Sequence, residues 1–331
     1  MKIINVILTG GVGSRLWPLS RKEKPKQYID LFEGKSLFQQ TVERNLSISD
    51  ELLIVGNTEN AHLSRKALTE LNINRFKEVI EATPRNTAAA IAFAALSVNE
   101  EDILIVTPSD HLIEDEKQYT NAINEAVGLA KNNFIVTFGL QPTKPETGFG
   151  YIQIQENEVL SFREKPNEET ANEFINSGDF FWNSGMFCFK AGVFLKELKK
   201  NQLAVYTASK EAFNKMENST LPLEESLKIP SISVDYAVME KSNKMKAVKS
   251  YFKWSDMGSF ESVYDYLIKN DHPIDRNGNM VIGSSLHTEF LGLKKCILVI
   301  TDDAILVLKK EKAQDVKKIY ENLNNKNIDL Q

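Results

Sequence analysis

Apolar segments alternate with helical patterns along roughly the first 140 residues of the chain. Five short aliphatic runs have the length and composition of buried strands: 3–8, 52–55, 78–81, 103–107 and 134–138. Between them, apolar residues recur at helical spacing around 37–42, 63–71, 87–96 and 119–130. Ser36, with Gln39 three residues later, predicts a capping box on the first of these helices. This alternation predicts an α/β fold with a Rossmann-like, mostly parallel sheet flanked by helices.

The pattern changes after Gly139. A polar loop rich in glycine and proline covers 143–150, and a predicted hairpin follows at 151–155 and 159–162. A helix at 168–176, a loosely patterned helical region at 200–232 and a strand at 247–252 come next. Further β candidates follow at 281–283, 289–293, 296–301 and 304–308, and a closing helix is predicted at 313–322. The best linker candidate is 271–279, which is rich in Asp, Asn, Gly and Pro. We therefore expect a large domain over residues 1–272 and a small β-rich domain with a closing helix over 273–331.

The first strand leads directly into the loop Gly10-Gly11-Val12-Gly13-Ser14-Arg15. Its three glycines lack the Cβ atoms that would keep a phosphate away from the backbone, so consecutive N–H groups can turn toward one anion. A basic tail follows, with Arg15, Arg21, Lys22, Lys24 and Lys26. Ligands of open α/β sheets bind outside the carboxyl ends of the strands. The loop and its tail therefore predict a polyphosphate site, although the loop alone is also consistent with a tight turn that binds no ligand.

Two better-known phosphate-binding patterns fit this loop poorly. A dinucleotide-binding loop opens directly into a helix, whereas Pro18 and Pro25 hinder a continuous helix here. Gly34-Lys35-Ser36 resembles the end of a Walker motif, but no glycine occupies position 29. The loop pattern therefore disfavours a nicotinamide-dependent oxidoreductase.

Composition narrows the choice of partner. The chain has 331 residues and a net charge of −5, so its basic cluster favours a small anionic ligand over nucleic acid. The apolar N-terminal stretch is too short for a signal peptide, and no stretch approaches the length of a membrane span, so we expect a cytoplasmic protein without a membrane partner. Cys188 and Cys296 lie in apolar contexts that predict buried free thiols, with a single disulfide as the alternative.

Further motifs follow the glycine loop and its continuation to Arg21. They are Lys24-Pro25-Lys26-Gln27, Arg85-Asn86-Thr87-Ala88, Pro108-Ser109-Asp110-His111, Pro145 to Ile152, Glu164-Lys165-Pro166, Trp182 to Phe187, Asp235 to Lys241 and Trp254-Ser255-Asp256-Met257-Gly258. In this order, over about residues 3–260, they resemble the sugar-1-phosphate nucleotidyltransferases, and most of all the bacterial mannose-1-phosphate guanylyltransferases. Thr9 stands where alanine is usual in that family, and Val12 where serine is commoner. The resemblance implies a nucleotidyltransferase fold of the glycosyltransferase-A type over 1–272, with a short C-terminal β-rich extension.

The reaction that the resemblance implies is the transfer of GMP from GTP to α-D-mannose 1-phosphate, which gives GDP-mannose and pyrophosphate and uses Mg²⁺. A phosphate monoester has a second pKa of about 6, so the attacking oxygen is already ionised at neutral pH and needs no general base. Catalysis then rests on positioning and on neutralising charge. The implied catalytic residues are Arg15, Lys26, Asp110 and Asp256, of which Asp110 and Asp256 would bind the metal. His111 is interpreted as a packing residue, or as one that supports a neighbouring ligand residue, rather than as a base.

On the nucleotide side, the loop would present N–H groups to the triphosphate, Arg15 would bind the β and γ oxygens, and Lys26 would neutralise charge at the α-phosphate. For Lys26 the alternative is a solvated surface lysine. Glu81 is the first choice for reading guanine, because a carboxylate can accept from both N1–H and the 2-amino group. The implied nucleotide-binding residues are Gly10, Gly11, Gly13, Ser14, Arg15, Lys26, Glu81, Arg85, Asn86, Thr87, Ser109 and Asp110.

On the sugar-phosphate side, the matching residues are Gly150, Glu164, Lys165, Asn183 and Gly185. Glu164 could accept from sugar hydroxyls, Lys165 could bind the phosphate, and Asn183 could both donate and accept. Phe180, Phe181 and Trp182 are interpreted as core rather than as a sugar platform.

Two alternatives stay open. One is a GTP-dependent transfer to another sugar 1-phosphate, such as that of a manno-heptose or of fucose. The other is a non-catalytic relative that senses a nucleotide sugar, but the presence of Arg15, Lys26, Asp110, Lys165 and Asp256 favours an enzyme. The C-terminal extension resembles one that follows the catalytic domain in these guanylyltransferases, and we expect it to form a homodimer.

Overall fold

The computed structural model describes residues 1–31, 34–323 and 330. The chain divides into two compact units. The first contains residues 1–10, 41–109 and 113–254, and the second contains 11–40, 110–112 and 255–331. Each unit is therefore assembled from segments that lie far apart in the sequence.

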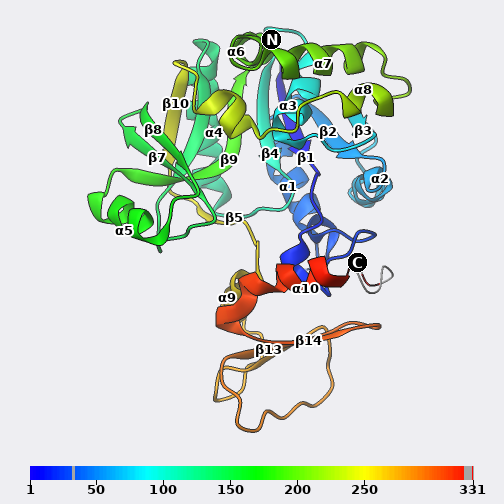
Figure 1. Ribbon diagram of the computed structural model, residues 1–331, viewed down its shortest axis with the longest axis vertical. Helices are drawn as coiled ribbons and strands as arrows, with labels where there is room; N and C mark the ends of the chain where they lie inside the picture. Colours follow the sequence, from blue (N-terminus) through cyan, green and yellow to red (C-terminus); the bar gives the residue numbers. More distant parts are fainter. Residues whose placement is uncertain (32–33, 324–329, 331) are drawn as a thin grey trace. The chain divides into compact units, whose positions relative to one another are not determined.

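A nine-stranded sheet with the order β3-β2-β1-β4-β9-β6-β10-β8-β7 forms the centre of the first unit (Figure 1). Its strands are β1 (Ile3–Leu8), β2 (Glu51–Asn57), β3 (Lys77–Glu81), β4 (Ile103–Pro108), β6 (Ile135–Leu140), β7 (Gly150–Gln155), β8 (Glu158–Glu164), β9 (Phe180–Lys190) and β10 (Met245–Ser250). Of the five strands predicted in the first half, β1, β2, β3 and β4 pair in parallel, as expected, whereas β6 lies between β9 and β10. β9 is antiparallel to both β4 and β6, and β7 and β8 form the predicted hairpin, so the sheet as a whole is mixed.

The parallel strands are buried on both faces, which explains their continuous apolar sequence. In β4, Leu104 and Val106 pack into one core, while Ile103 and Ile105 pack into the other. Side chains alternate between the faces of a strand, so a run without polar residues requires cover on both sides. Asn5 is the polar exception in β1, and its amide donates to the Ile105 carbonyl at 3.1 Å and to the Thr107 hydroxyl at 3.2 Å.

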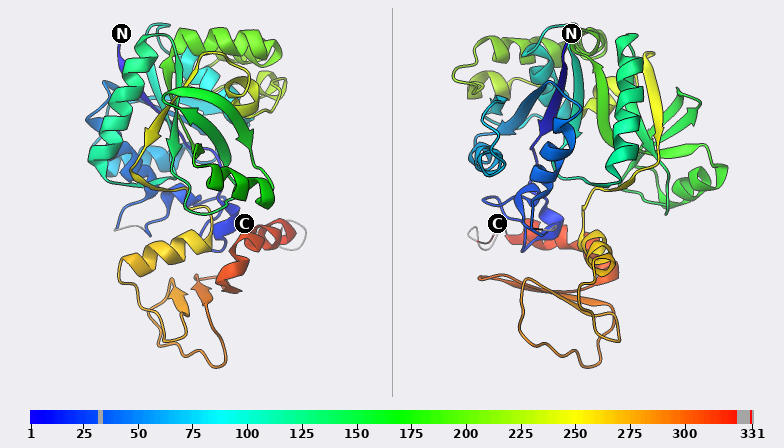
Figure 2. Two further views of the ribbon diagram at one scale, coloured as in Figure 1. Left: turned by 90° about the vertical axis from the view of Figure 1, so that its left-hand side faces the viewer. Right: turned by 180° about the vertical axis from the view of Figure 1, so that it is seen from behind.

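Helices cover the two faces of this sheet (Figures 1 and 2). The alanine-rich α3 (Asn86–Leu96), with α6 (Ala191–Asn201) and α7 (Leu203–Asn214), packs into the core of one face, and α4 (Glu116–Lys131) packs into that of the other. The first unit also contains α2 (Ala61–Glu70), α5 (Glu168–Ser177), the short α8 (Leu223–Leu227) and a π-helical turn at Asp235–Met239. Among the described residues, no helix has the length and apolarity that a membrane span requires.

Among the longer elements of the first unit, β9 and α6 were not predicted from the sequence. β9 includes the aromatic stretch that starts at Phe180, and α6 follows it directly. Phe181 and Trp182 are buried, so their interpretation as core residues is confirmed. Phe180 stacks on Phe174 of α5 with ring centroids 4.0 Å apart.

The second unit has its own core, around α9 (Phe260–Lys269) and a small sheet of β12 (Met280–Ile282), β13 (Cys296–Ile300) and β14 (Ile305–Lys309). It also contains short 3₁₀ turns at Ser14–Leu16, Lys26–Tyr28 and Lys310–Asp315, and the closing helix α10 (Val316–Leu323). The indole of Trp17 donates to the carbonyl of Leu330 at 2.7 Å. Two short strands, β5 (Leu112–Glu114) and β11 (Lys253–Ser255), pair where the chain passes from one unit to the other.

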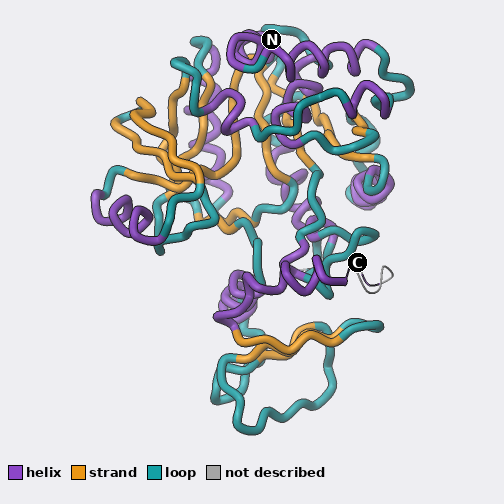
Figure 3. Tube along the Cα trace, in the orientation of Figure 1, coloured by secondary structure: helices purple, strands orange, loops and turns teal. Residues whose placement is uncertain are grey.

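One predicted strand is wrong. Residues 289–293 lie in the long loop between β12 and β13 (Figure 3). Leu291 is 96% exposed, so no packing surface stabilises an extended conformation there. An apolar alternation makes a strand only when a neighbouring strand accepts its hydrogen bonds and a core accepts its side chains.

Two local predictions are confirmed. Ser36 caps α1 (Leu37–Leu46), because the Gln39 N–H donates to its hydroxyl at 3.2 Å and its own N–H donates to the Gln39 side chain at 3.0 Å. Cys188 and Cys296 are both buried free thiols. Burial raises the pKa of the Cys188 thiol well above its usual value, as is typical of a structural cysteine.

Candidate active site

The glycine loop is fixed by hydrogen bonds to its own carbonyl groups. In the second unit, the Lys26 N–H donates to the Val12 carbonyl at 3.1 Å, and the Ser20 hydroxyl donates to the Gly13 carbonyl at 2.7 Å. The Gln27 amide donates to the Gly11 carbonyl at 3.4 Å. These hydrogen bonds to carbonyl groups fix the conformation of the loop.

Gly13 has a specific steric role. Its φ of 76° lies in the left-handed region, and a Cβ atom added there would lie 2.5 Å from the Cβ of Lys26. Gly11, with φ of 93°, has nothing within 4 Å of the corresponding position. A side chain at position 13 would therefore collide with Lys26, whereas one at position 11 would meet no neighbouring atom.

Lys26 joins three distant segments of the second unit. Its ammonium lies 2.7 Å from the Asp110 carboxylate and donates to the main-chain carbonyl of Asp256 at 2.6 Å. The residue is only 5% exposed, which excludes the alternative of a solvated surface lysine. Lys26, Asp110 and Asp256, three of the predicted catalytic residues, are thus brought into direct contact.

Asp110 is the acid that this arrangement keeps charged. Burial opposes ionisation of the Asp110 carboxyl, but the nearby Lys26 and His111 outweigh it and hold its pKa below the usual value. The His111 ring lies 3.9 Å from this carboxylate and is 9% exposed. Asp110 is therefore available as an anion that could bind a cation.

Asp256 opens a tight turn before α9. Its carboxylate accepts from the Gly258 N–H at 3.1 Å, and a Cβ on Gly258 would lie 2.4 Å from the same side chain. Between them, Met257 has a φ of 45° that is rare for a side chain of its size. The sequence Asp256-Met257-Gly258 is thus required for a carboxylate that folds back toward its own main chain.

Other predicted nucleotide-binding residues lie at the carboxyl edge of the parallel strands in the first unit. Gly10 follows β1, Ser109 follows β4, and Glu81 ends β3. Ser109 is 1% exposed, and its hydroxyl is one of the buried polar groups with no hydrogen-bond partner among the described residues. Ser14 and Arg15 belong to the second unit, in the 3₁₀ turn that follows Gly13, and the Arg15 side chain is exposed.

Glu81 is a buried acid with weak protein contacts. Glu81 is 6% exposed. The only hydrogen bond that the described residues donate to its carboxylate is a long one of 3.5 Å from the Arg85 N–H. Burial raises the pKa of the Glu81 carboxyl to about 7. A carboxylate in this environment would be stabilised by neutral N–H donors.

The Arg85-Asn86-Thr87 motif holds another segment of the chain. The Arg85 guanidinium donates to the Ile229 carbonyl at 2.7 Å, and the Thr87 hydroxyl accepts from the Val234 N–H at 2.8 Å. Asn86 has a φ of 70° and its side chain accepts from the Thr87 N–H at 2.8 Å. The motif was predicted to bind nucleotide, a role that stays a prediction, and its Arg85 and Thr87 side chains anchor residues 229–234.

The predicted sugar-phosphate residues lie together in the first unit. Lys165 pairs with Glu164 at 2.6 Å, and this hydrogen bond raises the pKa of Lys165. A Cβ on Gly150 would lie 2.4 Å from the Glu164 carboxylate. Asn183 of β9 is two residues before Gly185, whose N–H donates to the Asn183 side chain at 3.3 Å. Lys165 and Gly185 both have positive φ, 48° and 70°.

Two residues of this cluster were missed. Asp235 accepts from the Asn183 amide at 3.0 Å, and the Thr137 hydroxyl donates to the other end of that amide at 3.0 Å. Asp235 begins one of the motifs that carry the family resemblance, so a signal for it was present. Thr137 lies inside an apolar strand, where no sequence signal separates it from the core.

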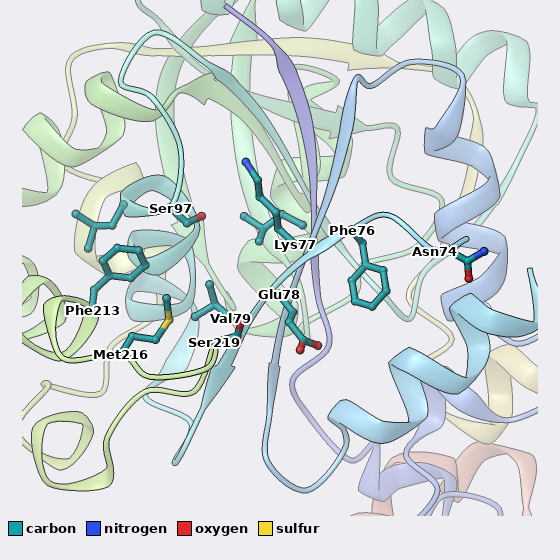
Figure 4. A pocket seen from close by; sticks show the side chains of 11 residues that line it. Asn74, Phe76, Lys77, Glu78, Val79, Ser97, Phe213, Met216 and Ser219 are labelled. Atoms are coloured by element: carbon teal, nitrogen blue, oxygen red, sulfur yellow. The ribbon is translucent and has the colours of Figure 1, made fainter. Parts of the chain in front are cut away.

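A separate pocket of about 730 Å³ lies at the outer edge of β3 (Figure 4). Phe76, Phe213 and Met216 are among its lining side chains. None of the predicted site residues lines it.

The described residues contain no group of three or more His, Cys, Asp or Glu side chains placed to hold a metal ion. Asp110 offers a carboxylate beside the Lys26 ammonium, and Asp256 contacts the same ammonium through its main-chain carbonyl. Mg²⁺ is often held by one or two carboxylates, with waters and substrate phosphates completing its shell, so these two residues fit that ion.

Comparison with known proteins identifies the fold. The family model for nucleotidyl transferases matches residues 4–271, and the model for the MannoseP isomerase/GMP-like beta-helix domain matches 272–323. A crystal structure from Thermus thermophilus, named mannose-1-phosphate geranyltransferase, has a TM-score of 0.84 and 28% identity, and covers 98% of this chain and 100% of its own. The nucleotidyltransferase fold, with its mixed sheet and C-terminal β-rich part, is therefore confirmed.

Curated relatives agree with this assignment. The mannose-1-phosphate guanylyltransferase RfbM of Salmonella typhimurium is 37% identical over 98% of this chain and 73% of its own length. The alginate biosynthesis protein AlgA of Pseudomonas putida is 37% identical over 97% of this chain and 72% of its own. The chain thus belongs to the nucleotidyl transferase family, as a relative of mannose-1-phosphate guanylyltransferases.

Proposed function

We propose that this protein transfers GMP from GTP to α-D-mannose 1-phosphate, which yields GDP-mannose and pyrophosphate and serves GDP-mannose biosynthesis. The observation that carries the proposal is the contact of Lys26 with both Asp110 and Asp256. A buried ammonium between a carboxylate and a carbonyl is suited to a reaction in which phosphate charge is moved. The named activity of RfbM supports the same substrate pair.

The reaction needs no general base. An ionised oxygen of the sugar phosphate attacks the α-phosphorus of GTP in line, the bond to the β-phosphate bridging oxygen breaks, and pyrophosphate leaves. Lys26 neutralises charge at the α-phosphate, and Arg15 binds the β and γ oxygens with its planar guanidinium. The N–H groups of Gly10, Gly11, Gly13 and Ser14 hold the leaving end of the triphosphate.

Asp110 and Asp256 would hold Mg²⁺. The ion, when bound, neutralises phosphate charge and orients the triphosphate. Asp110 suits this role because its carboxyl stays ionised beside Lys26.

On the sugar side, Lys165 exchanges its contact with Glu164 for the phosphate of the sugar, and Glu164 becomes free to accept from a hydroxyl. Glu81, with Asn86, reads guanine at the carboxyl edge of β3. A GTP-dependent transfer to a manno-heptose or fucose 1-phosphate is the second candidate, because ring stereochemistry is read by geometry that residue types alone do not fix. A non-catalytic, nucleotide-sugar-sensing protein is less well supported, since such a protein has no need for the buried Lys26–Asp110 pair.

We further propose that the protein is cytoplasmic, binds neither nucleic acid nor membranes, and is a homodimer through the β-rich domain over 273–331. β13 and β14 present an apolar outer face. Ile305 and Val307 are 65% and 59% exposed, and they pair with Ile300 and Leu298 across the sheet. A second copy of the chain could cover this face, since contiguous exposed apolar residues of this kind typically mark an interface.

The substrate assignment is tested with purified protein, Mg²⁺, each of the four nucleoside triphosphates and a panel of sugar 1-phosphates. We expect pyrophosphate release to be highest with GTP and mannose 1-phosphate. Release with another pair, and none with this one, would overturn the substrate assignment.

Replacement of the proposed metal ligand tests the role of Asp110. Asp110→Ala should lower turnover by about 100-fold or more, because the triphosphate loses its cation and Lys26 loses its partner. Asp30→Ala, which removes an exposed partner of Lys24, is the matched control and should be close to wild type. Undiminished turnover of Asp110→Ala at saturating Mg²⁺ would contradict the metal assignment.

The pKa of about 7 at Glu81 predicts a pH-dependent affinity for GTP. Guanine donors need the ionised carboxylate, so affinity is lost as the pH falls below 7 and levels off above it. The ratio of wild-type affinity to that of Glu81→Gln should rise roughly tenfold from pH 6 to pH 8, because the ionised fraction rises by about that factor. Titration calorimetry measures both affinities, and their ratio cancels the titration of GTP itself.

Glu78→Gln is the control for this experiment, since Glu78 lies on the same strand but pairs with Arg65. Its affinity should follow that of the wild type at each pH. A wild-type to Glu81→Gln ratio that does not change with pH would contradict the guanine role of Glu81.

The dimer is tested by light scattering at micromolar concentration. The wild type should show twice the chain mass of 37.5 kDa. Val307→Asp places a charge on the apolar face and should give the monomer, whereas Leu160→Asp, at a 54% exposed position of β8, should not. A monomeric wild type would count against the homodimer.

A further inference from the structure

The side-chain amide of Asn183 has only one possible orientation. Its Oδ1 accepts from the Gly185 N–H at 3.3 Å and from the Thr137 hydroxyl at 3.0 Å, and its Nδ2 donates to the Asp235 carboxylate at 3.0 Å. A main-chain N–H can only donate and an ionised carboxylate can only accept, so turning the amide would place like groups against each other. The orientation is thus set by chemistry at both ends of the amide.

This orientation limits what Asn183 can offer to a sugar. A carbonyl oxygen has two lone pairs, and Gly185 and Thr137 supply two donors to it. The amide can still donate, but its oxygen is a poor acceptor for a ring hydroxyl. The acceptor in this part of the cluster is the carboxylate on the other side of the amide, Asp235.

Asp235 is held firmly from the opposite direction. The segment that leads to it is bound through Ile229, Ile232 and Val234 to Arg85, Ala88 and Thr87 of the α3 terminus. Asp235 then begins a π-helical turn, and its carbonyl accepts from the Glu240 N–H at 3.0 Å. Such turns are rare and frequently lie at functional sites.

The electrostatic surroundings of Asp235 favour neutral hydroxyl donors. Burial, together with the nearby Glu164 carboxylate, raises the pKa of Asp235 to about 6. Asn183 and Lys165 oppose this shift but do not cancel it. Carboxylates that raise each other's pKa in this way are stabilised when neutral O–H donors bind to them.

We propose that Asp235 is a specificity-determining residue that accepts a hydrogen bond from one ring hydroxyl of the sugar 1-phosphate, while Asn183, positioned by Thr137, donates beside it. The inference rests on the proposed function only in that the ligand is a sugar 1-phosphate. It assigns to Asp235 the acceptor role that residue type alone had suggested for Asn183.

The test compares the wild type with Asp235→Asn, which keeps the shape of the side chain and its contact with Asn183. Asp179→Asn is the matched control, because Asp179 also accepts from a side-chain amide, that of Gln153 at 2.6 Å. Asp179 directly precedes β9, the strand that carries Asn183. Each protein is assayed with the sugar 1-phosphate that the wild type prefers, and with the 2-, 3-, 4- and 6-deoxy analogues of that compound. Calorimetric binding of the same compounds supplies a readout that does not depend on turnover.

Asp235→Asn should lower kcat/KM for the parent sugar 1-phosphate by about tenfold or more, through a higher KM for the sugar with an unchanged KM for GTP. For one deoxy analogue, which lacks the hydroxyl that Asp235 contacts, the variant and the wild type should agree within about threefold. Asp179→Asn should match the wild type on every compound.

An equal loss on the parent and on all four analogues would reduce Asp235 to a structural role and overturn the proposal, as would no loss at all. If Asp235→Asn unfolds, the alternative variant is Thr137→Val, which removes one of the two donors to the Asn183 oxygen. It should raise the KM for the sugar and leave that for GTP unchanged, and an unchanged sugar KM would overturn the proposal. The identity of the sugar 1-phosphate that the wild type prefers tests the proposed function. The role of Asp235 is tested separately, by the ratio of the variant's kcat/KM to that of the wild type on that same compound.

Discussion

The ammonium of Lys26 is the group on which the second unit depends. A cation that is 5% exposed must find partners that replace water, and it finds them in the Asp110 carboxylate and the Asp256 carbonyl. These partners come from three segments that are far apart in the sequence, so one desolvated charge fixes how the segments meet. Gly13 is part of the same constraint, because any side chain there would occupy the space of Lys26. The glycine is thus needed for the lysine at least as much as for a phosphate.

Some of the chain's unusual backbone conformations lie at candidate site residues. Asn86, Lys165 and Met257 have positive φ without being glycine, and Gly11, Gly13 and Gly185 share that region. Each such non-glycine residue costs about 1–3 kcal/mol, which persists only where the surroundings impose it. In the first unit the surroundings are a sheet that is buried on both faces, and this supports the loops that leave its strands. The rigid sheet and the strained loops are therefore two parts of one arrangement.

The sequence predicted the parallel strands and the Ser36 capping box well, because both depend on local pattern. It predicted the residue types of the site through ordered motifs, but not their contacts, since nothing in a one-dimensional pattern brings residue 26 to residues 110 and 256. The strand predicted at 289–293 was wrong because alternation carries no information on whether a partner strand is present. β9 was not predicted because its aromatic residues indicate core positions but do not indicate which type of element carries them. Asn183 was identified, but the orientation of its amide depends on contacts with the Gly185 N–H and the Asp235 carboxylate, which the sequence pattern does not show.

The carboxylates of the candidate site differ in their surroundings, and this difference supports the different ligands that are proposed for them. Asp110 lies beside an ammonium, so its pKa is lowered and it remains an anion that can share a cation with phosphate oxygens. Glu81 and Asp235 are buried, and burial raises the pKa of both, to about 7 and about 6. An acid of the second kind gains most from neutral N–H or O–H donors, which stabilise its charge without adding another. The residue type is acidic in all three cases, but the lowered pKa of Asp110 suits the metal-binding role proposed for it, whereas the raised pKa values of Glu81 and Asp235 suit the proposed recognition of a base and of a sugar.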